Sequence, residues 1–302
     1  VSGPVLSLAN AASAVSDWRA VGGGEAGDFR YDLETPGLVY AGEYGGFLSR
    51  YQEGSGQYRN ISPVVTDPLA LPASEMRQRF QWTAPAELSP HDPATIYHGA
   101  NVLFRSRDRG ETWAVISPDL TRNDKAKQGW SGGPITGDNT GVEVYGTIFA
   151  IDESPLTRGE IWTGSDDGRV HVSVDDGTNW TDVTPKGLPA DATVEGLVAS
   201  RHVAGRAYVV AHRYRLGDDR PFLFVSDDRG RSWRSLSAGL PADLPLFAIA
   251  EDEQDVVATT ELANASRIEQ RRGQPFVVES SDHGESPAVQ PKPATGQCHG
   301  GG

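Results

Sequence analysis

The sequence predicts an all-β fold, a β-propeller of four-stranded antiparallel blades, of which about five are visible as part of a larger propeller. One short pattern recurs along the chain: Ser, any residue, Asp, any residue, Gly, any residue, a small polar residue and Trp. Its copies start at residues 106, 173, 226 and 280, so successive copies are 67, 53 and 54 residues apart. Each interval holds about four apolar, strand-like segments, and 35 Gly and 20 Pro among 302 residues supply the turns between them. A motif at such a spacing is typical of repeat architectures, and four strands per unit make one propeller blade.

The recurring pattern has the residue types of a tight turn between two antiparallel strands. Ser and Asp side chains hydrogen-bond to backbone groups one or two residues on, and Gly adopts the positive φ that such a turn needs. Trp then opens the next strand and packs its large apolar face between neighbouring sheets. We therefore assign the pattern residues to structure and not to catalysis. They are Ser106, Asp108, Gly110, Trp113, Ser173, Asp175, Gly177, Trp180, Ser226, Asp228, Gly230 and Trp233.

Apolar segments between the turns predict the strands of each unit. In the first three units they cover residues 17–21, 37–42 and 46–51, then 80–82, 95–99 and 102–104, then 145–150, 160–164 and 169–172. In the last two units they cover residues 194–199, 207–210 and 222–225, then 245–250 and 256–258. Residues 261–272 instead have a charged pattern typical of a helix, at the place where the fifth unit should continue with strands.

The chain is predicted to divide into four parts: a lead segment at 1–16, propeller blades at 17–255, a degenerate last blade at 256–287 and a disordered tail at 288–302. The last blade is degenerate because Pro287 stands where the pattern requires Trp, and loss of a buried Trp costs about 3–5 kcal/mol. The tail is assigned from its Pro- and Gly-rich composition. The lead segment is mildly apolar but lacks the basic start of an intact signal peptide.

Charge and cysteine content argue against several classes of function. The formal net charge of -14 argues against a nucleic-acid partner, because phosphate binding needs a basic surface. The single cysteine, Cys298, allows no internal disulfide, and no Cys/His cluster has zinc spacing, so we expect no metal. No apolar run approaches the length of a membrane span. The sequence contains no phosphate-binding loop and no Gly-x-Ser-x-Gly segment of the kind that carries a nucleophilic serine. We expect no cofactor.

The recurring turn resembles the Asp-box, or bacterial-neuraminidase (BNR) repeat, of propellers such as sialidases, family 74 xyloglucanases and sortilin-type receptors. Residues 18–46, 89–93, 117–124 and 131–143 are similar to large secreted bacterial proteins labelled glycosyl hydrolase or sortilin-like. This resemblance covers roughly residues 17–250 and implies a secreted or periplasmic location. Propellers of that superfamily usually have six to eight blades, so the remaining blades are expected from the parent chain or from another subunit.

A long insertion at residues 127–145 makes the first interval the longest, and long loops on a rigid scaffold often carry function. Its Trp130 could stack on a sugar ring, while Asp138 and Glu143 could form the acid–base pair of a glycoside hydrolase. The separation of two such carboxyls distinguishes retaining from inverting enzymes, and the sequence leaves that choice open. The alternative is a turn stabilised by Asp138 and Asn139, with an exposed Glu143.

Other candidate ligand-binding residues lie near predicted strand ends. Glu25 and Glu43 follow Gly-rich turns and could face the central channel, and Arg79 could reach an acidic ligand. Together with Trp130 and Asn139 they complete the predicted ligand-binding set. Solvated loop positions are the alternative for the two glutamates. The three arginines and Tyr–Glu pair of sialidases have no residue-by-residue match in the chain.

Two hypotheses of function follow. The first is an extracytoplasmic propeller that binds glycans, or hydrolyses them as a glycoside-hydrolase-like protein acting on polysaccharide. The second is a non-catalytic propeller that binds peptides or proteins, as sortilin-like receptors and assembly factors do. The sequence leaves open whether the chain is an enzyme.

Overall fold

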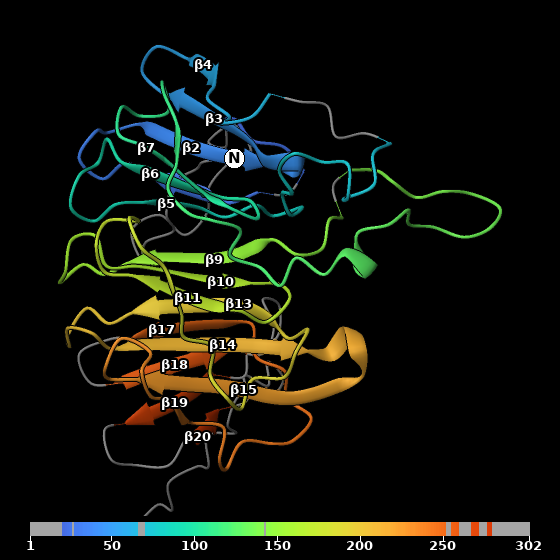
Figure 1. Cartoon of the computed structure of the whole chain (residues 1–302). Helices are drawn as coiled ribbons and strands as arrows, with labels where there is room; N and C mark the ends of the chain where they lie inside the picture. Colours follow the sequence, from blue (N-terminus) through green and yellow to red (C-terminus); the bar gives the residue numbers. More distant parts are fainter. Residues whose placement is uncertain are drawn as a thin grey trace, which may run out of the picture.

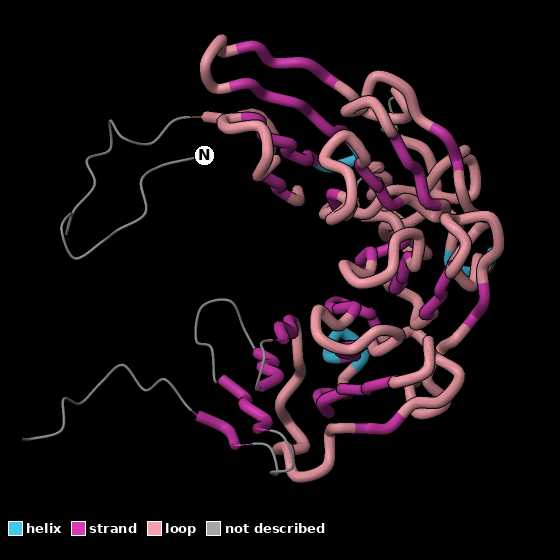
Figure 2. Tube along the Cα trace, turned by 90° about the vertical axis from the view of Figure 1, so that its left-hand side faces the viewer, coloured by secondary structure: helices cyan, strands magenta, loops and turns pink. Residues whose placement is uncertain are grey.

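The structure, a computed structural model, describes residues 20–25, 27–65, 70–141, 143–251, 255–259, 267–271 and 277–279. These residues form five four-stranded sheets, each built from four consecutive antiparallel strands. The sheets follow the chain from the blue end of Figure 1 to its red end, and Figure 2 shows them as successive parts of an open arc. The first strands of neighbouring sheets contact one another along the inner side. This is the arrangement of propeller blades, and it confirms the predicted fold class.

Each blade runs from its innermost first strand to its outermost fourth strand. The first blade contains β1 (Phe29–Tyr31), β2 (Leu38–Glu43), β3 (Phe47–Gln52) and β4 (Gln57–Asn60), and the second β5 (Ala86–Leu88), β6 (Ile96–Gly99), β7 (Leu103–Ser106) and β8 (Ala114–Val115). The third contains β9 (Ile148–Glu153), β10 (Ile161–Ser165), β11 (Val170–Ser173) and β12 (Thr181–Asp182). The fourth contains β13 (Thr193–Ala199), β14 (Ala207–Arg213), β15 (Asp218–Ser226) and β16 (Arg234–Ser235). The fifth contains β17 (Ala248–Glu251), β18 (Asp255–Thr259), β19 (Arg267–Arg271) and β20 (Val277–Glu279). Three short 3-10 helices, η2 (Tyr44–Gly46), η3 (Lys125–Lys127) and η4 (Tyr214–Leu216), lie between strands.

Two local expectations are wrong. Residues 80–82 are not in a strand, because the innermost strand of the second blade is β5, farther along the chain. Within the helix-like stretch, residues 267–271 form β19, which pairs with β18 and β20. Pairing on both sides overrides the local helical pattern, as tertiary context commonly does.

Several other predictions fall on parts of the chain that the structure does not describe. These are residues 1–16 and 288–302, most of the predicted first strand, and the partial copy of the pattern at 280–287. Ala20 and Val21, the described end of that first strand, are not in a strand. The predicted division into four parts stays a prediction.

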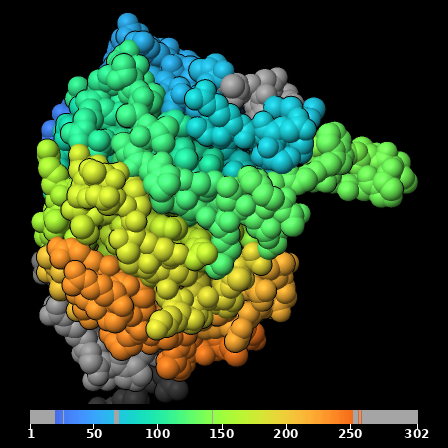
Figure 3. Space-filling model, viewed as in Figure 1, coloured from blue at the N-terminus to red at the C-terminus, as the bar shows by residue number. Residues whose placement is uncertain are grey.

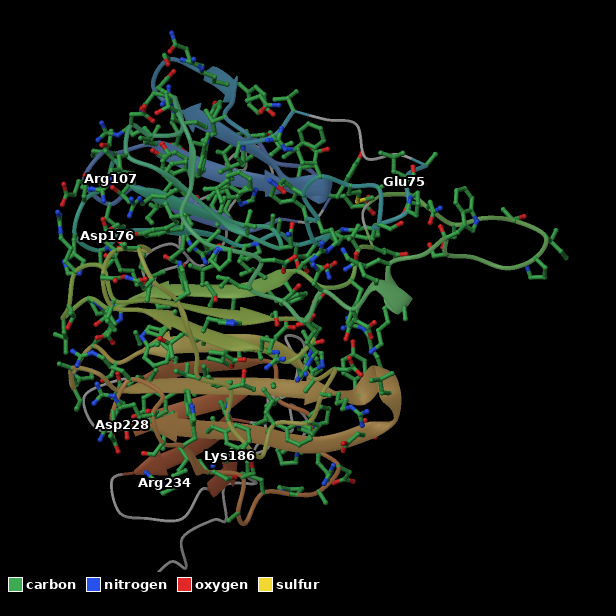
Figure 4. The ribbon with its side chains drawn as sticks, viewed as in Figure 1. Glu75, Arg107, Asp176, Lys186, Asp228 and Arg234 are labelled. Carbon is green, nitrogen blue, oxygen red and sulfur yellow. The ribbon has the colours of Figure 1, made fainter. Side chains whose placement is uncertain are left out.

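The three full copies of the pattern, here called the repeated turns, join the third and fourth strands of the second, third and fourth blades. In the first of them the Ser106 hydroxyl accepts a hydrogen bond from Gly110 N at 2.8 Å, and Asp108 Oδ1 accepts one from Thr112 N at 2.8 Å. The same two bonds recur in the other two repeated turns. Donors from Thr112 hold the pKa of the Asp108 carboxyl down at about 2. Figure 4 places Arg107, Asp176 and Asp228, one from each turn, along the same end of the molecule.

Each repeated turn also fastens its blade to the blade before it. Nε1 of Trp180 donates to the Ile116 carbonyl at 2.8 Å, and a Cβ on Gly177 would lie 2.9 Å from the side chain of the same Ile116. In the other two turns, Trp113 Nε1 donates to the Ile61 carbonyl at 2.7 Å, and Trp233 Nε1 donates to the Val183 carbonyl at 2.6 Å. Ile61 and Val183 each belong to the preceding blade. Gly and Trp of the pattern therefore act together as a clamp between blades.

Charged pairs add a second link at the same end. The residue before Gly in each turn has a positive φ of 58° to 61° and carries a charge. Arg229 Nε lies 2.7 Å from Oε2 of Glu160 in the third blade, whose side chain is fully buried. Asp176 accepts a 2.6 Å bond from Arg105 of the second blade. Ion pairs thus connect successive blades where the clamps do.

The hydrophobic core is divided among the spaces between blades. Separate clusters of buried side chains lie between the first and second, second and third, third and fourth, and fourth and fifth blades. The largest fully buried side chain, Trp162, packs edge-on against Trp233 of the repeated turn at 226–233. Each blade is therefore stabilised by its neighbours, as expected of a repeat architecture.

Candidate ligand-binding site

The inner edges of the five blades enclose a cavity of about 800 Å³, here called the inner cavity. It is lined by β5, β9, β13 and β17 and by the chain around β1. Among its described lining residues carboxylates outnumber guanidinium groups: they are Asp28, Glu87, Asp152, Glu195 and Glu251 against Arg30 and Arg201. The cavity therefore disfavours anions and suits a neutral or cationic ligand.

Arg30 holds two of these carboxylates in place. Its guanidinium lies 2.6 Å from Asp28 Oδ1 and 2.9 Å from Glu87 Oε2. Asp28 Oδ2 in turn accepts a hydrogen bond from Ala86 N in the second blade. Burial nevertheless raises the pKa of Glu87, against the opposing effect of Arg30. The pair Arg30–Glu87 thus fixes a carboxylate at the inner edge.

Asp152 lies on the neighbouring inner strand β9, and its carboxyl also has a raised pKa. Burial raises the pKa of its carboxyl to about 7, and the nearby Glu87 adds to this effect, while a 2.7 Å bond from Ala199 N opposes it. A carboxyl with such a pKa exchanges protons near neutral pH, which is the property a general acid or base needs. Asp152 and Glu87 are therefore a pair of carboxyls in the inner cavity whose pKa values are both raised by burial.

A second cavity of about 700 Å³, here called the mouth pocket, opens at the end opposite the repeated turns. It is formed by the segments that lead into β5, β9 and β13 and by the turns that follow β10 and β14. Thr83 and Phe149 line both cavities, so the mouth pocket continues into the inner cavity. Together they form one groove from the surface to the inner strands.

Aromatic rings and carboxylates share the wall of the mouth pocket. The half-buried rings of Trp82, Tyr145 and Phe149 line it, with Glu143 and Asp191 beside them. The Tyr145 hydroxyl donates to Asp191 Oδ1, and the Lys127 ammonium lies over the Tyr145 ring at 5.2 Å. Burial, together with the Asp191 bond, raises the pKa of Tyr145, so it stays protonated. An aromatic surface with polar groups at its rim is a common form of ligand pocket.

Asp166, at the turn between β10 and β11, connects segments of this wall through hydrogen bonds. Its carboxylate accepts bonds from Gly146 N at 3.0 Å, Thr147 N at 2.8 Å, Thr147 Oγ1 at 3.0 Å and Gln81 Nε2 at 3.3 Å. These bonds join two of the segments that form the mouth pocket. Burial raises the pKa of Asp166 to about 7 in spite of them.

Asp166→Asn is expected to make the stability of the protein less dependent on pH. The folded-state pKa is raised above the value of 3.8 for an unperturbed carboxyl, so the protonated form stabilises the fold below that value. This contribution is lost as pH rises toward about 7. Urea unfolding at intervals across this range should show a shallower loss of stability in Asp166→Asn than in the wild type. An unchanged pH profile would contradict the assignment.

The predicted insertion forms a hairpin, residues 129–139, that stands clear of the rest of the molecule in Figure 3. Trp130 is 64% exposed, its ring lies against Gly137, and it lines neither the mouth pocket nor the inner cavity. Asn139 Oδ1 accepts a bond from Ser131 N at 3.0 Å, which closes the hairpin. This geometry favours the turn-stabilising alternative for Asn139.

The two predicted catalytic residues lie at the base of this hairpin. Asp138 and Glu143 are both exposed and both line a small cavity of about 70 Å³ beneath it. Glu143 alone also lines the mouth pocket. Their catalytic role stays a prediction, and Glu143 is the member of the pair that reaches the groove.

The remaining predicted ligand-binding residues lie away from the groove. Arg79 is 4% exposed, with its guanidinium bonded to the Gly146 carbonyl at 3.1 Å and to Asp119 at 2.9 Å, an arrangement that gives it a structural role. Glu25 is an exposed residue before β1, and Glu43 ends β2 next to Gly24. Neither glutamate is among the lining residues of the inner cavity or the mouth pocket.

The inner-strand carboxylates Glu87 and Asp152 are absent from the predicted site residues. Glu87 lies between Ala86 and Leu88, and Asp152 follows the apolar run 148–151 in β9, so each is a charged residue next to apolar residues of an inner strand. A buried strand rarely carries a charge without a partner. A charged residue beside apolar residues in the first strand of a unit is therefore the sequence feature from which Glu87 and Asp152 could have been predicted.

Within the described ranges, no group of three or more His, Cys, Asp or Glu side chains is arranged to hold a metal ion. The same part of the chain contains no helix with the length and apolar character needed to cross a membrane.

No protein-family model and no curated protein matches the chain. Among solved structures, it is similar to the GH74 xyloglucanase from Xanthomonas campestris, with a TM-score of 0.56 and 19% identity over 92% of this chain and 40% of that one. It is also similar to the GH74 enzyme from Niastella koreensis, with a TM-score of 0.52 and 12% identity over 86% of this chain and 37% of that one. A structure of YCF48 bound to D1 peptide gives a TM-score of 0.48 at 11% identity, covering 83% of this chain and 65% of that one.

These likenesses, together with the five sheets, show that the chain is a β-propeller protein. It spans about 40% of the length of the GH74 structures that it matches. Identities this low support the fold alone, because one fold hosts many functions.

Proposed function

We propose that the chain is part of an Asp-box propeller that binds a polysaccharide along the groove formed by the mouth pocket and the inner cavity. The observation that carries this proposal is the wall of Trp82, Tyr145 and Phe149 in the mouth pocket, with Glu143 and Asp191 beside it. Aromatic faces stack on the apolar faces of sugar rings, while carboxylates accept hydrogen bonds from sugar hydroxyls. The excess of carboxylates in the inner cavity favours a neutral glycan over an acidic one.

The size of the groove also supports a glycan as the ligand. The groove has room for several sugar rings, since its two connected cavities measure about 700 and about 800 Å³. One of the two GH74 proteins of similar fold is a xyloglucanase, and this likeness serves here only to choose a first ligand. Xyloglucan oligosaccharides are therefore the first neutral ligands to test, and we expect the protein to act in a secreted or periplasmic setting where such polymers occur.

Hydrolysis of the bound glycan is the second candidate function. The observation that favours it is Asp152, whose pKa of about 7 allows it to donate or accept a proton near neutral pH, close to the carboxylate of Glu87. In that mechanism a protonated carboxyl supplies a proton to the leaving oxygen, and the second carboxyl activates water or attacks the sugar. Glu143 at the mouth remains a candidate for either role.

Trp82→Ala is expected to weaken binding of a neutral oligosaccharide roughly tenfold, because it removes one stacking face of about 1.4 kcal/mol. Isothermal titration with xyloglucan oligosaccharides measures the change, and Trp82→Phe should retain part of the affinity. Trp130→Ala is the matched control, because that ring lies on the hairpin outside the groove. A larger loss of affinity in Trp130→Ala than in Trp82→Ala would indicate that the ligand binds at the hairpin, and it would contradict the proposal.

A reducing-sugar assay on the same ligands separates the two candidates. Release of reducing ends that disappears in Asp152→Asn, or in Glu143→Gln, would establish hydrolysis and identify the acting carboxyl. Tight binding without release would establish a non-catalytic glycan-binding propeller. Binding of peptides in place of glycans, by a properly folded protein, would favour the receptor-like alternative.

A further inference from the structure

A third cavity, of about 600 Å³, lies at the edge of the first blade, at the end of the molecule that carries the repeated turns. We call it the arginine pocket, because Arg50, Arg59 and Arg109 line it together with the amides of Gln52 and Gln57. No carboxylate is among its described lining residues. That composition is unusual in a chain with 41 acidic and 27 basic residues.

Glu111 holds two of the guanidinium groups in fixed positions from one side. Its carboxylate lies 3.0 Å from Arg50 Nη2 and 2.6 Å from Arg59 Nη2. Arg50 Nη1 also donates to the Arg109 carbonyl at 2.8 Å. A guanidinium has five N–H donors, so these bonds orient the two groups and leave further donors for a ligand. Such preorganisation reduces the entropy cost of binding.

Arg109 is the least satisfied of the three. Its Nη2 makes only a long contact of 3.4 Å with Thr35 Oγ1, and its Nε is buried without a hydrogen-bond partner. Asp32 faces Nε at 3.8 Å, beyond hydrogen-bond distance. By contrast, Arg229, at the equivalent place in another repeated turn, makes a 2.7 Å bond to Glu160. The buried Nε lies against Asp32 and cannot reach a ligand, so the donors that Arg109 offers to the pocket are those of its outer Nη1 and Nη2 groups.

The local charge balance favours an anion in spite of the acidic chain. The three guanidinium groups pair directly with only two carboxylates, Glu111 and Asp32, so the arginines of the pocket outnumber the carboxylates that contact them. Guanidinium groups bind carboxylate and sulfate through paired N–H donors.

We propose that the arginine pocket binds the carboxylate or sulfate group of an acidic saccharide. Tyr58, whose ring is 57% exposed at the pocket, offers a stacking face for the sugar that carries the anion. Gln52 and Gln57 offer amide groups for its hydroxyls. The site is separate from the groove and does not depend on the function proposed for the groove.

The test is isothermal titration of the full chain with three probes: oligogalacturonate, a neutral galactose oligosaccharide and inorganic sulfate. We expect oligogalacturonate to bind, to weaken when salt rises from about 0.05 to about 0.5 M, and to bind more tightly than sulfate. The neutral oligosaccharide should not bind at this site. Neutral binding in the groove should be unchanged in Arg59→Gln. An equal loss of neutral and acidic saccharide affinity in that variant, binding of sulfate alone, or no binding of oligogalacturonate would overturn the proposal.

Paired variants locate the site. Arg59→Gln should weaken oligogalacturonate binding about fivefold or more, since it removes one exposed cation. Arg220→Gln removes an equally exposed arginine that is paired with Asp218 in another blade, and it should have no effect. Equal losses in Arg59→Gln and Arg220→Gln would show a non-specific charge effect and overturn the assignment.

Glu111→Gln provides a second, opposite test. The variant removes a carboxylate that competes with the ligand for Arg50 and Arg59. An amide oxygen in the place of Oε1 still accepts from Arg50 Nη2 and Arg59 Nη1, while the contact of Arg59 Nη2 with Oε2 is lost. Affinity should rise about threefold, within the range measured for exposed ion pairs. If the arginines served only to join blades, affinity would not rise, and that result would contradict the proposal.

Discussion

Trp180→Ala is expected to lower the free energy of unfolding by about 3 kcal/mol, the lower end of the range for losing a packed Trp. The indole lies between the second and third blades and donates to the Ile116 carbonyl at 2.8 Å. Its removal leaves that carbonyl without this bond and opens a space beside Ile116, against which Gly177 also packs. The loss falls on a contact between blades, so the neighbouring blades should be weakened together.

Chemical denaturation followed by circular dichroism measures this effect. Trp130→Ala is the control, because Trp130 is 64% exposed and its loss should change stability by less than about 0.5 kcal/mol. Trp180→Phe should show an intermediate loss, since it keeps an aromatic ring but removes the N–H donor. Equal stability of the Trp180 and Trp130 variants would show that the repeated turns do not clamp the blades.

Arg229→Met is expected to destabilise the protein by about 3 kcal/mol at neutral pH, the cost typical of leaving a buried carboxylate without its partner. Glu160 is fully buried, and its other hydrogen bond is a 3.2 Å contact with Trp162 Nε1. Methionine keeps the length of the side chain, so the packing changes little.

The comparison variant is Arg220→Met. Arg220 makes an equally short ion pair with Asp218, at 2.7 Å, but its side chain is 63% exposed. Exposed pairs contribute about 0–1 kcal/mol, so this variant should melt close to the wild type. A loss in Arg229→Met that is no larger than in Arg220→Met would argue against the buried pair as a link between blades.

The fold could be predicted from the sequence because its signal is local and repeated. Ser106 and Asp108 form their hydrogen bonds within the eight-residue turn, while Gly110 and Trp113 contact Ile61 of the preceding blade. The same eight-residue pattern recurs in two more blades. The strand β19 could not be predicted in this way. Its own residues favour a helix, and its conformation depends on pairing with β18 and β20.

The candidate site was harder to predict because it is assembled from distant segments. The mouth pocket joins residues 81–83, 143–145, 191–193 and 215–216, which only the order of the blades brings together. Within the longest loop, Glu143 lines the mouth pocket, whereas Trp130 lies on the exposed hairpin and lines neither the mouth pocket nor the inner cavity. Arg79 has the charge of a ligand-binding residue, but its bonds to the Gly146 carbonyl and Asp119 are invisible in the sequence.

The most direct measurement of the proposed function is hydrogen exchange of the chain with and without a saturating neutral oligosaccharide. Binding in the groove predicts protection of residues 81–83, 143–149 and 191–193, which line the mouth pocket and its junction with the inner cavity. The exposed hairpin at 129–139 and the arginine pocket should be unaffected. Protection confined to the hairpin, or no protection under conditions where titration shows binding, would contradict the account.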